Sequence, residues 1–171
     1  MAIQNVSVVY SDERAAVKRK AIEQRATWMA LTYKEGLKDG ANMESITRRA
    51  ITTTGSIRGA ELKASMKDLG NCLEFRDAFL GNPVSRTTFQ MEFVSCDEDE
   101  LNVNFHYCPL LAAWQKLGID EETCVKLCDM AMDGDRAIAA GAGLKLDISE
   151  TIAQGCPSCR LRFHKQQKTA K

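Results

Sequence analysis

The hydrophobic pattern of this chain changes period near residue 83, and this change limits the fold more than any other feature. Before it, apolar residues recur at helical spacing over residues 12–37 and 43–69. After it, apolar and polar residues alternate over residues 86–93 and 101–106, a pattern typical of half-buried strands. The chain therefore joins a helical first part to a part that contains strands, which predicts the α+β class.

The second half of the chain adds further helices and strands. The periodicity predicts helices over residues 110–117 and 120–140, with Asp120 as the N-cap of the second, and strands over 144–148 and 159–164. We therefore expect an antiparallel sheet of about four strands, packed by the N-terminal helices and by this central helix pair.

The packing of these elements can be predicted from their apolar positions. Helices that carry Trp28 and Trp114 are expected to cover the sheet, and the first helix, capped by Ser11, is long enough to pair with a second copy in a homo-oligomer. In the second helix, Gly55 or Gly59 marks a bend or a close packing contact, because glycine is a poor helix former. The apolar face of the sheet would consist of Phe89, Met91, Phe93, Leu101, Val103, Phe105, Leu144, Leu146, Ile148, Leu161 and Phe163.

The length and composition favour a single globular domain. A chain of 171 residues has the size of one domain, and 44% hydrophobic and 27% charged residues are ordinary values. We divide it into a helical region (1–82), an α+β region that carries the candidate site (83–164) and a frayed basic tail (165–171).

Charge and hydropathy exclude several kinds of partner. With 23 basic and 23 acidic residues, the chain has no bulk charge to attract nucleic acid or a membrane surface. It has no run of about 18 apolar residues for a membrane span, and its N-terminus lacks the pattern of a signal peptide. We therefore expect a cytoplasmic protein that acts on a small molecule. Residues 86–159 carry 13 acidic and 5 basic side chains, so an anionic ligand there would need one well-placed arginine.

The seven cysteines are out of proportion to the rest of the composition, and five of them fall between residues 108 and 159. In a reducing compartment cysteines are core residues, metal ligands or nucleophiles more often than disulfides. Cys156 and Cys159 have the spacing of a zinc knuckle or a redox dithiol, but the chain has no second such pair. Cys72 and Cys96 carry no signal that we can interpret.

The segment His106-Tyr107-Cys108-Pro109 is the densest group of reactive side chains. It lies where a predicted strand meets a predicted helix, and backbone N–H groups at a helix N-terminus stabilise a thiolate. On an extended chain His106 points to the same side as Cys108, so it could act as a base or as a metal ligand. A buried cysteine beside a half-exposed histidine is the alternative interpretation.

The helix over residues 120–140 carries a second group. Cys124, Cys128, Met132 and Asp135 share one stripe of that helix, because Cys128 follows Cys124 by four residues and Asp135 follows Cys128 by seven. A carboxylate at the end of such a stripe needs a partner, since burying an unpaired charge is costly. Cys124 suits a core position, whereas Cys128 and Asp129 suit a core or a site role equally well.

Three separated segments resemble one family, that of L-2-amino-thiazoline-4-carboxylic acid hydrolases. They are residues 105–118 (FHYCPLLAAWQKLG), residues 127–135 (LCDMAMDGD), and residues 146–155 (LDISETIAQG) followed by the CRLRF sequence at 159–163. The resemblance covers roughly residues 86–164. It implies a hydrolase that opens a cyclic amidine, the 2-amino-thiazoline ring, to give a carbamoyl-cysteine.

The resemblance also implies which residues form the site, but it leaves two mechanisms open. In the first, Cys108, Cys128 and Cys159, with His106 as a further candidate, hold a zinc-like divalent ion that activates water. Asp129 or Asp135 then moves protons. In the second, no metal binds, Cys108 attacks the amidine carbon, and a carboxylate protonates the departing nitrogen.

The remaining predictions concern the residues that bind the substrate and an alternative, non-catalytic function. The substrate carboxylate needs a cation, for which Arg162 is the first candidate because arginine binds carboxylates bidentately. Arg160 and Arg136 come next, and Tyr107 is a further substrate-binding candidate. The alternative function is a non-catalytic sensor domain that binds a small molecule or a metal in a cysteine-rich pocket.

Overall fold

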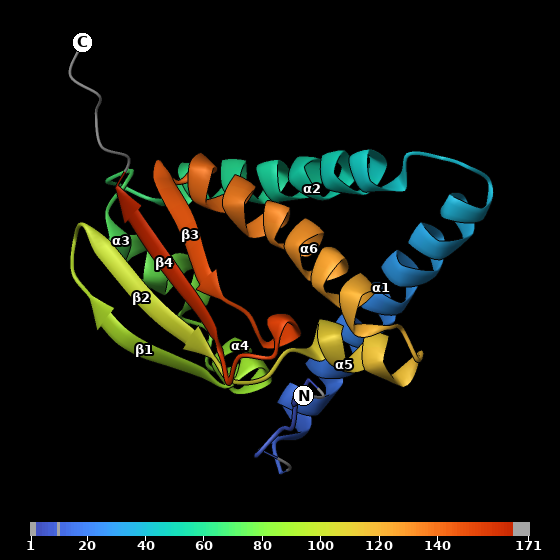
Figure 1. Cartoon of the computed structure of the whole chain (residues 1–171). Helices are drawn as coiled ribbons and strands as arrows, with labels where there is room; N and C mark the ends of the chain where they lie inside the picture. The colour runs from blue at the N-terminus through green and yellow to red at the C-terminus, as the bar shows by residue number, and fades with distance from the viewer. Residues whose placement is uncertain (1–2, 10, 166–171) are drawn as a thin grey trace.

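The computed structural model describes residues 3–9 and 11–165, and it has the α+β architecture that the sequence predicts (Figure 1). The helices and helical turns are α1 (Glu13–Lys38), α2 (Met43–Ser65), α3 (Cys72–Phe75), the π-helical turn η1 (Arg76–Leu80), α4 (Pro83–Phe89), α5 (Pro109–Lys116), α6 (Glu121–Gly141) and the 3-10 turn η2 (Ile152–Gln154). The strands are β1 (Met91–Cys96), β2 (Glu100–Phe105), β3 (Leu144–Glu150) and β4 (Cys159–Lys165).

The four strands form one antiparallel sheet in the order β1-β2-β4-β3. Leu101 of β2 and Leu146 of β3 both stand opposite Phe163 of β4. All three are buried, and the Phe163 ring centroid lies 4.9 Å from that of Phe75 in α3. Ten of the predicted face residues are buried or partly buried in the sheet: Met91, Phe93, Leu101, Val103, Phe105, Leu144, Leu146, Ile148, Leu161 and Phe163.

Helix α6 joins the sheet to the helical half of the molecule. It packs on β3 and runs along α2 (Figure 1). A Cβ atom on Gly55 of α2 would lie 2.3 Å from the carbonyl oxygen of Gly134, and one on Gly141 would lie 2.6 Å from the Cα atom of Gly59. The glycines therefore serve a close packing contact between α2 and α6, one of the two alternatives left open by the sequence.

The strand predicted over residues 86–93 is wrong in its first half, where the chain forms α4. The side chain of Asn82 accepts hydrogen bonds from two backbone N–H groups of the first turn, and Pro83 suits that turn. These capping signals outweigh the alternation of apolar residues. Gln90, with a φ of 51°, ends the helix, so Phe89 lies in α4 and not in the sheet.

Neither tryptophan covers the sheet, which corrects the predicted packing. Trp28 on α1 is 72% exposed. Trp114 on α5 is buried, but its Nε1–H donates a hydrogen bond to the carbonyl oxygen of Ala26 in α1 at 3.0 Å, because α5 packs against α1. The two long N-terminal helices thus pack on other helices, whereas α3 contacts the inner strands β2 and β4 and α6 contacts the edge strand β3.

Several element boundaries also differ from prediction. Asp12, not Ser11, caps α1, and α2 ends at Ser65, earlier than its apolar pattern suggests. Lys165 is the last residue of β4, and the remainder of the predicted tail, residues 166–171, lies outside the described residues. Within the described ranges, none of the helices has the length and apolar character needed to span a membrane.

Candidate active site

Cys108 lies at the junction of β2 and α5, where it is the N-cap residue of the helix. Asn5, 103 positions away in the sequence, holds both backbone polar groups of Cys108. The Cys108 N–H donates to Asn5 Oδ1 at 2.9 Å, and the Cys108 carbonyl oxygen accepts from Asn5 Nδ2 at 2.8 Å. Pro109 follows at the first helical position, which its fixed φ suits. The N-terminal segment therefore fixes this cysteine at the start of a helix.

Three influences act on the pKa of the Cys108 thiol. Burial raises the pKa, because the ionised sulfur is poorly solvated. The backbone N–H groups of Leu111 and Leu110 at the start of α5 lower it, and the nearby charge of Asp135 raises it. The net effect is a raised pKa. Cys108 is therefore a neutral thiol near pH 7, and it needs a base to become a nucleophile.

Cys128 on α6 and Cys159 at the start of β4 lie close enough to Cys108 for its charge to raise the pKa of both. Burial is the larger cause in each case, and it brings the pKa of Cys159 to about 12. Thr151 is near enough to Cys128 for its side chain to lower the pKa of the Cys128 thiol, and the Ile152 N–H donates to the Cys159 sulfur at 3.3 Å. The structure thus gathers the three cysteines that the sequence singles out.

Asp135 is the carboxylate next to this cluster. It follows Cys128 by two turns of α6, and its charge reaches the Cys108 thiol. Burial raises the pKa of Asp135 to about 6, against the lowering influence of Arg25 and Arg136. Near pH 7 most of this carboxylate is ionised, yet it is close to protonation. It can therefore accept a proton and return it.

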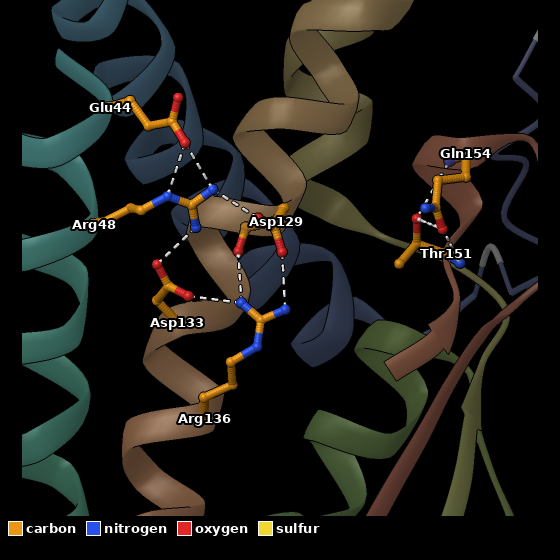
Figure 2. A network of polar contacts seen from close by, with 7 residues as sticks. All are labelled: Glu44, Arg48, Asp129, Asp133, Arg136, Thr151 and Gln154. Atoms are coloured by element: carbon orange, nitrogen blue, oxygen red, sulfur yellow. Dashed lines mark hydrogen bonds and ion pairs between the residues drawn. The ribbon is translucent and has the colours of Figure 1, made fainter. Parts of the chain in front are cut away.

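Asp129 belongs instead to a network of ion pairs between α2 and α6 (Figure 2). Its carboxylate lies 2.7 Å from Arg48 of α2 and 2.8 Å from Arg136 of α6. The same two arginines bind Asp133, at 2.9 and 2.6 Å respectively. Burial raises the pKa of Asp129, but hydrogen bonds from Arg136 and Arg48 outweigh it and leave the pKa below its ordinary value. This carboxylate holds two helices together as a permanent anion.

His106 and Tyr107 are close to Cys108 in sequence but face other groups. His106 is exposed, and its Nε2 atom lies 2.9 Å from Oε2 of Glu92. It lines a separate hollow of about 660 Å³ between the N-terminal segment, α4 and β1. Tyr107 is buried, and its ring centroid lies 4.5 Å from the guanidinium carbon of Arg19. Both stay predictions as site residues, and the structure gives each a partner outside the thiol cluster.

The arginines predicted to bind the substrate carboxylate are also engaged. Arg162 points from the exposed face of β4, where its Nε donates to Glu100 Oε2 at 2.6 Å. Cys159 is buried on the other face of the same strand, because alternate strand residues point to opposite sides. Arg160 pairs with Glu150 at 3.2 Å.

The cysteines and their acidic neighbours do not form a metal site. Within residues 3–9 and 11–165, no group of three His, Cys, Asp or Glu side chains has an arrangement that could hold an ion. The three thiols of the cluster are near one another without forming such a group, and burial favours their protonated forms. The residues therefore do not fit the predicted zinc-like site.

A cavity of about 560 Å³ lies between α1, α2 and α6, beside the first turn of α5. Its size and its mainly apolar lining with a few polar groups are typical of cavities that bind small molecules. Asp135 and Leu110 both line the cavity, and Leu110 is two residues from Cys108. The cavity therefore gives a small molecule access to the carboxylate beside the thiol cluster.

Three residues of this arrangement were missed by sequence reasoning. They are Asn5, Thr151 and Arg25, which come from the N-terminal segment, the η2 turn and α1. Asn5 and Arg25 lie in no motif that suggests a role, and Thr151 lies in the family-like segment 146–155 without a signal of its own, because each acts on a residue far away in the sequence. Only the fold places them at the site.

The fold and site together define an α+β protein with a cluster of three thiols, one of them at a helix N-terminus, and an adjacent carboxylate of raised pKa. The chain belongs to the L-2-amino-thiazoline-4-carboxylic acid hydrolase family, whose model matches residues 19–163. This match extends the predicted resemblance into α1 and α2, and it supports a hydrolase-like function. No curated protein and no solved structure matches the chain.

Proposed function

We propose that this protein is a hydrolase that opens the C–N bond of a cyclic amidine such as L-2-amino-thiazoline-4-carboxylic acid, with Cys108 as the nucleophile. The observation that carries the proposal is the proximity of two groups. Cys108 lies at the N-terminus of α5, two residues before the cavity-lining Leu110, and Asp135, which lines the same cavity, is near enough for its charge to raise the pKa of the Cys108 thiol. Family membership supplies the class of substrate.

The first half of the reaction uses the raised pKa values of both groups. The Asp135 carboxylate accepts the Cys108 proton while the sulfur attacks the ring carbon between sulfur and nitrogen. With the amidine bound as its cation, the electron pair of the C=N bond moves to the ring nitrogen. Asp135 then donates its proton to that nitrogen, the C–N bond breaks, and the released amine leaves a thioimidate on Cys108.

The second half restores the enzyme. Water attacks the same carbon while Asp135 accepts a proton from it, and this proton returns to the Cys108 sulfur as the bond between carbon and Cys108 breaks. The carbon keeps the water oxygen, its exocyclic nitrogen and the substrate sulfur. The exocyclic C=N cation loses a proton to the free amine, so the product is cysteine with a carbamoyl group on its sulfur.

Turnover of L-2-amino-thiazoline-4-carboxylic acid tests this proposal directly. The Cys108→Ser variant should lose at least about 10³-fold in kcat, as expected when a nucleophile is removed. Cys96→Ser is the matched control, because Cys96 is also partly buried but lies at the end of β1. Intact-protein mass spectrometry of the quenched wild type should show the thioimidate on Cys108.

Other outcomes would contradict parts of the proposal. A product with its carbamoyl group on nitrogen carries a free thiol, detectable with a disulfide reagent, and would show that the C–S bond breaks instead. Retained activity in Cys108→Ser, or a full equivalent of zinc in protein purified without added metal, would favour the metal-assisted alternative. Binding without any product would favour the sensor alternative.

A further inference from the structure

The cavity between α1, α2 and α6 has an uneven distribution of charge. Most of its lining is apolar, including Met29, Met43, Ile51 and Ile138. Only three of the lining side chains are charged, namely Arg25, Arg58 and Asp135. A charged ligand that enters this cavity must therefore find its ionic partners among these three groups.

The two arginines of the cavity differ in their partners. Arg58 on α2 pairs with Glu61, with its Nη1 atom 2.7 Å from Oε2. Arg25 on α1 makes no ion pair with a carboxylate among residues 3–9 and 11–165. The charge of Arg25 nevertheless reaches Asp135, whose pKa it lowers. Arg25 is thus a cation with spare hydrogen-bonding capacity in the same cavity as the proposed proton carrier.

We propose that this cavity is the substrate site and that Arg25 binds the substrate carboxylate, which holds the amidine ring between α1 and Asp135. This inference rests on the proposed function. Arg25 takes the role that the sequence assigns to Arg162, which lies on the exposed face of β4 and is paired with Glu100. The guanidinium group suits this role because it can bind a carboxylate through two hydrogen bonds.

The position of Arg25 also explains how an acidic region can bind an acidic ligand. Residues 86–159 carry 13 acidic and 5 basic side chains, but Arg25 comes from α1, outside that region. Arg136, the other arginine near Asp135, is held by Asp129 and Asp133. The substrates selected would be small cyclic amidines that carry a carboxylate, with apolar surface on the remaining sides to contact the lining.

Kinetics with two substrates can test the role of Arg25. The substrates are L-2-amino-thiazoline-4-carboxylic acid and 2-amino-thiazoline, which lacks the carboxylate. Arg25→Gln should raise KM for the acid by about 10- to 100-fold, with a much smaller change in kcat, since it removes a charge-assisted contact. At pH 8, above the Asp135 midpoint, the same variant should lower kcat/KM for 2-amino-thiazoline by far less than kcat/KM for the acid, and Arg25→Lys should lie between it and the wild type. Arg58→Gln is the matched control, because Arg58 lines the same cavity but already has a partner.

The outcomes separate this inference from the proposed function. An equal loss on both substrates, or an unchanged KM for the acid in Arg25→Gln, would overturn the role of Arg25. If the wild type turns over neither compound, the proposed function fails, and calorimetric binding of the acid decides the question about Arg25. Binding that Arg25→Gln weakens by about 10-fold or more, and Arg58→Gln does not, would uphold the carboxylate site. Equal binding to all three proteins would refute it.

Discussion

Asp129 and Asp135 lie on the same helix, six positions apart, yet the fold gives them opposite chemistry. Asp129 faces α2, and the ion pairs with Arg48 of α2 and Arg136 of α6 keep its pKa below the ordinary value (Figure 2). Asp135 faces the cavity and the Cys108 thiol, where burial raises its pKa to about 6. A family motif that contains both carboxylates therefore combines a structural anion with a candidate proton carrier, and the surroundings decide which is which.

The largest expected effect that would separate the two carboxylates is on turnover. Asp135→Asn should lower kcat by about 10²- to 10⁴-fold, because the amide can neither accept the Cys108 proton nor return it. Asp129→Asn should change kcat by less than about 3-fold, since its partners are structural arginines. Steady-state kinetics on both purified variants would check this, and comparable losses in both would abolish the distinction.

The pH dependence of the reaction should reveal the same carboxylate. If the ionised form of Asp135 is the base, kcat/KM should rise about tenfold per pH unit below its pKa and level off above a midpoint of about 6. In Arg25→Gln the midpoint should move to higher pH, because Arg25 lowers the pKa of Asp135. Arg136 also faces Asp135, so its charge should keep this shift modest. A midpoint that stays in place in Arg25→Gln would show that another group titrates.

The elements that the sequence predicted well are those whose signals are local. Asp120 caps α6 as expected, with its side chain accepting from the Thr123 N–H at 2.8 Å, and β2, β3 and β4 follow the alternation of their residues. The failure at residues 86–89 also has a local cause, since a short alternation competed with the stronger capping signal of Asn82 and Pro83.

The site was predicted only in part, because its geometry depends on contacts between distant segments. The charge of Cys108, at the start of α5, reaches both Cys128 within α6 and Cys159 at the start of β4. His106, at the turn where the chain leaves β2 for α5, has an exposed ring whose Nε2 atom lies 2.9 Å from Oε2 of Glu92 in β1. Periodicity within β2 carries no information about that turn, nor about the position of α1.

Stability should respond to the two carboxylates in opposite directions. The pKa of Asp135 is higher in the folded protein, about 6 against 3.8, so the folded state binds more protons between these values. Its contribution to stability is therefore lost as pH rises from about 4 to about 6. The amide of Asp135→Asn does not ionise, so the variant avoids the cost of burying a charged carboxylate. Its free energy of unfolding at pH 7 should therefore be higher by about 2 kcal/mol. Urea unfolding at pH 4 and pH 7 would check this, and a destabilised Asp135→Asn at pH 7 would contradict it.

The smallest effect concerns Asp129, whose side chain is 48% exposed and whose ion pairs are therefore screened by solvent. Asp129→Asn should lower the free energy of unfolding at pH 7 by only about 0.5–1 kcal/mol, because Asp133 still pairs with both arginines. The pKa of Asp129 is lowered in the folded state, so this contribution is present above the unfolded pKa and is lost as pH falls through the folded one. Added salt should shrink the difference between wild type and variant further, since salt screens exposed charges. A difference that persists in 1 M NaCl would show that Asp129 stabilises the α2–α6 interface by packing rather than by charge.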